Sequence, residues 1–144
     1  MIAAHNFAPG EQLNIITHSH GGNVALAASH LGLAHRIDNL ITLNKPTLLG
    51  EDYVPRENIG NFYKISAYGD IIQYSGSDST AWSVDSHAIN LGIDTSASKI
   101  RPHAALIWDD QFRNMWWQWF QNQQKKQEPC ARTAAVDSQG NGTG

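Results

Sequence analysis

Ser19 is the residue of this chain best suited to act as a nucleophile. It lies in the segment T-H-S-H-G-G, after an apolar run and before an alanine-rich apolar segment, residues 24–31. A serine at the tip of a sharp strand-to-helix turn is the geometry of a nucleophile elbow. The tight turn requires small residues two positions before and after the serine. Here these are Thr17 and Gly21, and Gly22 relieves the same crowding against the helix. Threonine is larger than the usual glycine, so we expect some crowding to be tolerated.

The two histidines beside the serine allow a different interpretation. The letters T-H-S-H also open the zinc motif T-H-x-H-x-D-H of the metallo-β-lactamase family, in which His18 and His20 would bind the metal. The next two ligand positions of that motif hold Gly22 and Asn23. Glycine offers no side chain, and an amide carbonyl is a poor zinc ligand beside imidazole or carboxylate. A zinc-dependent hydrolase is therefore the less favoured alternative, and a turn without chemistry is another.

The elements that would position these residues can be read from the apolar pattern. Three short apolar runs are typical of strands buried on both faces, namely Leu13–Thr17, Ile37–Leu43 and Phe62–Tyr68. A helix is expected from Gly22 to about Leu31. Strand, helix, strand and strand in this order predict an α/β fold: a mostly parallel sheet with helices on both faces.

The second half of the chain begins with a segment that has no clear apolar pattern. Residues 71–101 are rich in Ser, Asp and Gly, with an apolar patch at Ala88–Ile93, and are expected to form a functional loop or cap. From Ala104 to about Gln123, aromatic residues recur at three- and four-residue spacings, which predicts a helix packed on the core. We expect a single domain over residues 1–123 and a disordered polar tail over residues 124–144.

The composition excludes several classes of protein. The net charge is -3 and no basic block is present, which argues against nucleic acid as a partner. No apolar stretch approaches the ~20 residues of a membrane span, and Met1–Gly10 lacks a signal-peptide pattern. The single cysteine, Cys130, cannot form an internal disulfide. No metal or organic cofactor is expected. The compartment stays open, because export within a larger effector would leave the same pattern.

Three stretches resemble the carboxyl-terminal half of an α/β-hydrolase of the lipase/esterase type. The segment Ile16–Gly22 looks like the lipase form H-S-x-G-G. The segment Leu40–Pro46 looks like a lipase strand that ends in a proline turn, and Tyr68–Asp70 is placed like an acid-bearing loop. A narrower likeness is to the hydrolase-like domains at the C-termini of bacterial RHS-type polymorphic toxins. That likeness implies delivery into a competitor and an acyl ester, a phospholipid among the candidates, as the target.

The resemblance implies a charge-relay site whose members follow the chain order serine, acid, histidine. Asp70 comes directly after the third strand and a glycine, where the acid is expected. His103 follows Pro102 and precedes the aromatic helix, in the loop that feeds the final helix. The predicted triad is therefore Ser19, Asp70 and His103. The reserve candidates are His87 for the base, and Asp78, Asp85 and Asp94 for the acid.

The residues next to the serine are expected to have other roles. The side chains of His18 and His20 should point away from the hydroxyl, so neither is expected to accept its proton. The backbone N–H of His20, at the start of the helix, is the predicted oxyanion donor. The second donor normally comes from a loop after an early strand, and no such strand precedes the elbow here.

The predicted function is that of a serine hydrolase that cleaves a carboxylic ester through an acyl-enzyme. Only three or four strands can be counted, against about eight in a full α/β-hydrolase. A truncated sheet would expose an edge strand and apolar faces, so a partner or an upstream segment is expected to complete it. The alternative is a non-catalytic α/β interaction domain, or a fragment of a larger effector.

Overall fold

The described part of the chain forms an all-parallel sheet of four strands. The computed structural model describes residues 5–31, 33–46, 54–70 and 88–137, with side chains described up to residue 126. The strands lie side by side in chain order, and each neighbouring pair is parallel. They are β1 (Asn14–His18), β2 (Ile37–Leu43), β3 (Ile59–Ala67) and β4 (Ile89–Ile93). The predicted α/β class is thereby confirmed.

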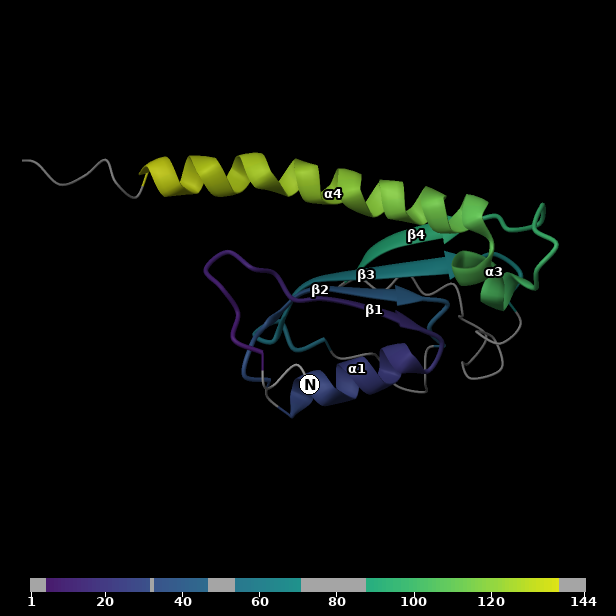
Figure 1. Ribbon diagram of the computed structural model, residues 1–144, viewed down its shortest axis with the longest axis horizontal. Coiled ribbons are helices and arrows are strands. Elements are labelled where there is room, and N and C mark those ends of the chain that lie inside the picture. The colour runs from purple at the N-terminus through teal and green to yellow at the C-terminus, as the bar shows by residue number, and fades with distance from the viewer. Residues whose placement is uncertain (1–4, 32, 47–53, 71–87, 138–144) are drawn as a thin grey trace, which may run out of the picture.

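Helices cover both faces of the sheet, as the apolar pattern predicts. They are α1 (Gly21–His30), α3 (Pro102–Trp108) and α4 (Asp110–Asp137). Figure 1 shows α1 on one face and α4 along the other, with α3 on the side of α4 near the ends of the strands. Because side chains alternate along a strand, the inner strands β2 and β3 supply both cores. Leu40 and Phe62 pack toward α1, whereas Ile41 and Tyr63 pack toward α3 and α4.

The first strand lies at an open edge of the sheet, and the expectation that it is buried is wrong. Within the described residues, β1 pairs with β2 alone, and Ile16 is 49% exposed. In contrast, β2 has a neighbour on either side, and Leu40 and Ile41 have no exposed surface. An apolar run identifies a strand but not its place in the sheet.

The aromatic segment forms two helices instead of one. At Asp109 the backbone leaves the helical region (φ -97°, ψ 114°), which separates α3 from α4. The Asp109 carboxylate then accepts the N–H of Gln111 at 3.1 Å and so caps the start of α4. The expected apolar stripe is confirmed in part: Trp116 and Phe120 are each 5% exposed in the core, whereas Trp108 is 71% and Met115 46% exposed.

The last helix also continues past the expected end near Gln123. Gln124 lies within α4, and its Nε2 donates to the hydroxyl of buried Tyr63 at 2.9 Å. The same amide donates to Asn39 Oδ1 at 3.1 Å. These contacts fasten α4 to β2 and β3, and the helix runs on to Asp137.

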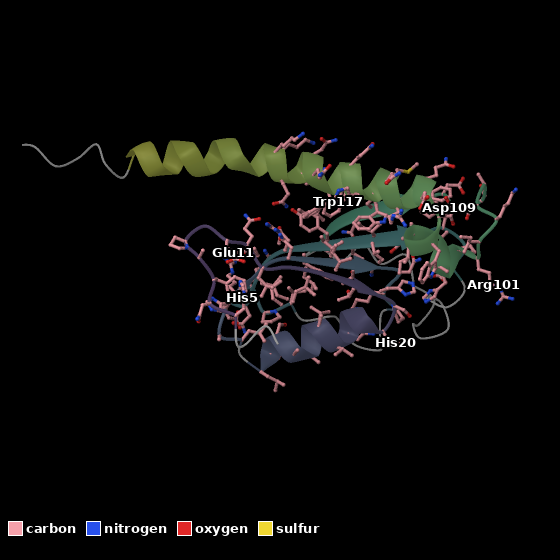
Figure 2. The ribbon with its side chains drawn as sticks, in the orientation of Figure 1. His5, Glu11, His20, Arg101, Asp109 and Trp117 are labelled. Carbon is pink, nitrogen blue, oxygen red and sulfur yellow. The ribbon has the colours of Figure 1, made fainter. Side chains whose placement is uncertain are left out.

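The apolar patch at Ala88–Ile93, expected within a loop, forms the outer strand β4. The strand β4 lies beside β3 and pairs with it in parallel, so that Ile93 is opposite Ala67 at the carboxyl end of β3. The carboxyl ends of all four parallel strands therefore meet at one end of the sheet. Figure 2 shows His20 at that end together with Arg101, while His5 and Glu11 lie at the opposite end.

Candidate active site

The backbone around Ser19 forms a sharp strand-to-helix turn. The strand β1 ends at His18 and α1 begins at Gly21, so only Ser19 and His20 make the connection. Ser19 has a φ of +53°, a left-handed conformation that non-glycine residues rarely adopt. Its N–H donates to the carbonyl of Leu43 at 2.9 Å, and its carbonyl accepts the N–H of Gly22 at 3.1 Å. The strained turn is thus held to β2 on one side and to α1 on the other.

The small residues of the motif have unequal roles. A Cβ added at Gly21 would lie 3.8 Å from the Cβ of Thr17, which is an ordinary van der Waals contact. The threonine in place of glycine is therefore accommodated. A Cβ added at Gly22 would lie 2.9 Å from two carbons of the Lys45 side chain and 3.1 Å from Thr42. The absent side chain at Gly22, rather than at Gly21, is what lets α1 pack against β2.

The structure brings the predicted acid and base together. The Nδ1 of His103 lies 2.7 Å from Oδ2 of Asp70, across 33 residues of sequence. The Asp70 side chain is 2% exposed and that of His103 is 16% exposed. Because a carboxylate accepts hydrogen bonds, this contact favours the neutral tautomer that carries its proton on Nδ1 and a lone pair on Nε2. That is the tautomer required of a general base.

His18 lies next to His103, in a role that the sequence did not predict. The two rings have centroids 4.6 Å apart and planes inclined at 50°. The Nε2–H of His18 donates to the backbone carbonyl of His103 at 2.7 Å. The expectation that His18 points away from the serine hydroxyl is compatible with this contact. The ring faces α3 and holds the backbone of His103.

Asn44 is a second residue that the sequence analysis passed over. It follows β2 directly, has no exposed surface and has a φ of +50°. Its Nδ2 donates to the carbonyls of Pro102 (3.1 Å) and His103 (2.9 Å), and its Oδ1 accepts the N–H of Ala67 (2.7 Å). The sequence feature that points to this role is an asparagine directly after a buried parallel strand, since asparagine tolerates the left-handed region better than most residues.

Ser19 is linked to the pair of Asp70 and His103 through its neighbour His18, whose ring centroid lies 4.6 Å from that of His103. Among the described residues, no hydrogen bond joins the Ser19 hydroxyl to the His103 ring. Catalytic hydrogen bonds of this kind often tighten only when substrate is bound. His20 is the N-cap of α1, so its N–H lies outside the hydrogen-bond ladder of the helix and at its positive end. This is where the predicted oxyanion donor has to lie.

Several reserve candidates can be placed or set aside. Asp78, Asp85 and His87 lie outside the described residues. Asp94 follows β4 and is fully exposed, and its Oδ1 accepts the N–H of Ser96 at 2.9 Å. This backbone hydrogen bond, together with one from the Ser96 hydroxyl, lowers the pKa of the Asp94 carboxyl. In the part of the chain that the structure describes, no three His, Cys, Asp or Glu side chains gather as metal ligands would.

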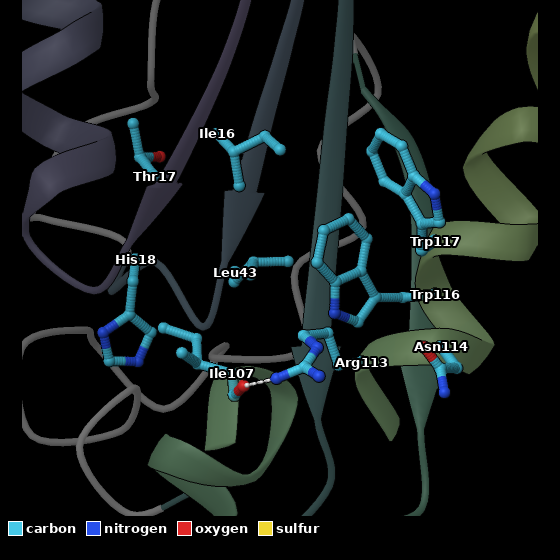
Figure 3. A pocket seen from close by; sticks show the side chains of 9 residues that line it. All are labelled: Ile16, Thr17, His18, Leu43, Ile107, Arg113, Asn114, Trp116 and Trp117. Carbon is cyan, nitrogen blue, oxygen red and sulfur yellow. Dashed lines mark hydrogen bonds between the residues drawn. The ribbon is translucent and has the colours of Figure 1, made fainter. Parts of the chain in front are cut away.

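An apolar pocket of about 470 Å³ adjoins the site on the face covered by α4. Figure 3 shows Ile16 and His18 on one wall and Trp116 and Trp117 on the other. Arg113 stands among the lining residues, with its guanidinium bonded to the carbonyl of Ile107 at 3.4 Å. It also pairs with Asp110. The pocket lies at the open edge of β1, and through His18 it adjoins the histidine pair.

The comparisons with known proteins yield nothing: no family model, no curated protein and no solved structure matches this chain. The site is therefore interpreted from its own geometry. Of the described helices, none combines the length and the apolar character needed to cross a membrane.

Proposed function

We propose that this protein is a serine hydrolase that cleaves a carboxylic ester, with Ser19 as nucleophile, His103 as general base and Asp70 as the residue that orients His103. The observation that carries the proposal is the 2.7 Å contact between His103 Nδ1 and a nearly inaccessible Asp70 carboxylate. Burial of a carboxylate this deep costs free energy through lost hydration, and a paired group has to offset that cost. Its pairing with a histidine beside a strained serine turn is typical of serine hydrolases.

The reaction proceeds in two halves. The hydroxyl oxygen of Ser19 attacks the ester carbonyl carbon while His103 Nε2 takes the hydroxyl proton. The His20 N–H stabilises the resulting oxyanion. The tetrahedral intermediate then expels the alkoxide, which receives the proton from His103 and leaves as the alcohol. Water attacks the acyl-enzyme with His103 again as base, and the carboxylic acid departs with Ser19 restored.

A fluorophosphonate probe tests the proposal directly, because it labels only an activated serine. We expect stoichiometric labelling at Ser19 and hydrolysis of p-nitrophenyl acetate by the wild-type protein. Both should be lost in Ser19→Ala, where removal of a triad serine lowers kcat by about 10⁶-fold. The matched control is Ser29→Ala, which removes a buried hydroxyl bonded within α1. An unlabelled wild-type protein, or full activity in Ser19→Ala, would overturn the proposal.

A further inference from the structure

We infer that Asn44 is a positioning residue of the active site, which holds the His103 backbone at the distance from β3 that the contact between His103 and Asp70 requires. The inference rests on the proposed function. It starts from the three hydrogen bonds of one amide side chain, each between 2.7 and 3.1 Å. They join β2 to the start of α3 and to the end of β3.

The two segments that Asn44 joins are those that carry the base and the acid. Its Nδ2 holds the carbonyl of His103 itself, at the start of α3. Its Oδ1 holds the N–H of Ala67, three residues before Asp70. The ion pair of Asp70 with His103 links the same two segments. The amide therefore sets the spacing of the two backbones, and the imidazole need not be held by the carboxylate alone.

The backbone of Asn44 supports a role for its side chain. A φ of +50° in a left-handed conformation costs an L residue free energy that glycine does not lose. Glycine would therefore fit the turn after β2 with less strain. Asparagine tolerates the conformation and adds two donors and one acceptor. The Asn44 side chain, with no exposed surface, directs both donors to the first turn of α3.

His18 reinforces the same carbonyl from the other side. The His103 carbonyl accepts from Asn44 Nδ2 at 2.9 Å and from His18 Nε2 at 2.7 Å. One donor comes from the residue after β2, and the other from the residue before Ser19. Asn44 therefore ties the His103 backbone to β3, the strand before Asp70. His18 ties it to β1, the strand before Ser19.

The test compares Asn44→Gly with Asn58→Ala. The glycine variant keeps the left-handed turn and loses all three hydrogen bonds. Asn58 is a matched control, because its Nδ2 donates to the carbonyl of Ser29 at 2.7 Å, away from the site. A shift of about 1 Å in a catalytic group reduces turnover by about 10²-fold. We expect that loss in kcat for Asn44→Gly with little change in KM, after normalisation to active sites, and no loss for Asn58→Ala.

Two further readouts separate positioning from a general effect on folding. The proton shared by His103 and Asp70 should give a low-field NMR signal that is retained in Asn58→Ala and lost or broadened in Asn44→Gly. His18→Phe, on the edge strand, keeps a ring and removes one donor. It should fold normally and lower kcat about tenfold, the factor that one neutral hydrogen bond can contribute.

The outcomes are distinguishable. A wild-type protein that neither hydrolyses esters nor labels at Ser19 would overturn the proposed function. An active wild type whose Asn44→Gly variant keeps both kcat and the low-field signal would overturn the positioning role. If Asn44→Gly does not fold, Asn44→Asp decides. It keeps the side-chain volume and the acceptor for Ala67, but it replaces the Nδ2 amide, the donor of both bonds, by one carboxylate oxygen that faces the two carbonyls. Full kcat in that variant would likewise refute the role of Asn44.

Discussion

The two glycines after Ser19 should respond oppositely to the same substitution. In Gly22→Ala the new Cβ would lie 2.9 Å from Lys45 and 3.1 Å from Thr42, whose side chains are 1% and 0% exposed. Neither neighbour has room to move aside. Overpacking of this kind typically costs about 1–3 kcal/mol. The gain from replacing glycine by alanine in a helix is roughly 0.5–1 kcal/mol.

The matched variant Gly21→Ala isolates the clash. Its Cβ would make one ordinary contact of 3.8 Å with Thr17, so only the helix gain remains. The free energy of unfolding of Gly22→Ala should therefore lie about 1–3 kcal/mol below that of Gly21→Ala. Urea denaturation followed by circular dichroism measures this difference, provided that both variants show the same m-value. Equal stabilities would refute the claim that Gly22 is required by its contact with Lys45.

Three further predictions concern the site and its surroundings. Asp70→Asn should leave the fold intact but hold the imidazole in the wrong tautomer, which lowers kcat for an ester by about 10⁴-fold; a loss below tenfold would contradict the role of Asp70. Trp116→Phe removes a 2.8 Å hydrogen bond from Nε1 to a buried carbonyl of α3, and should lower the free energy of unfolding by about 1–3 kcal/mol in urea denaturation. The Ser96 N–H, and to a smaller extent the Ser96 hydroxyl, lower the pKa of the Asp94 carboxyl. The ionised carboxylate therefore stabilises the folded protein above the unfolded pKa of this group, and this stabilisation is lost as pH falls through the folded pKa. A ¹³C NMR titration should place the Asp94 midpoint below the ordinary value of 3.8 for the group, and Ser96→Ala should raise it only in part, because the backbone donor remains.

The strand predictions succeeded where burial on both faces left a clear signal. Residues 37–43 have apolar side chains at positions 37, 40, 41 and 43, and the bounds of β2 are those predicted. The predicted start of the third strand is three residues late, because Ile59, the first residue of β3, is followed by Gly60 and Asn61, which are not apolar. The edge position of β1 could not be predicted, since an apolar run does not reveal whether a neighbour exists on either side.

The break between α3 and α4 depends on contacts that no periodicity reveals. Asp109 leaves the helical region while its Oδ2 accepts a hydrogen bond from the Ser98 hydroxyl at 2.7 Å, eleven residues earlier. The extension of α4 likewise depends on Gln124 reaching β2 and β3. In both places the deciding partner is distant in sequence, so local propensity alone predicts one helix with an earlier end.

The sequence by itself determined the α/β class and the serine turn, and it singled out Asp70 and His103, which the structure joins. Apolar runs and small residues at fixed spacings are local properties, so they can be recognised from the sequence alone. The tertiary structure alone decided that His18 and Asn44 hold the backbone of His103. Those contacts span 85 and 59 residues. They exist only because parallel strands bring their carboxyl ends to the same edge of the sheet, where a helix from the far end of the chain begins.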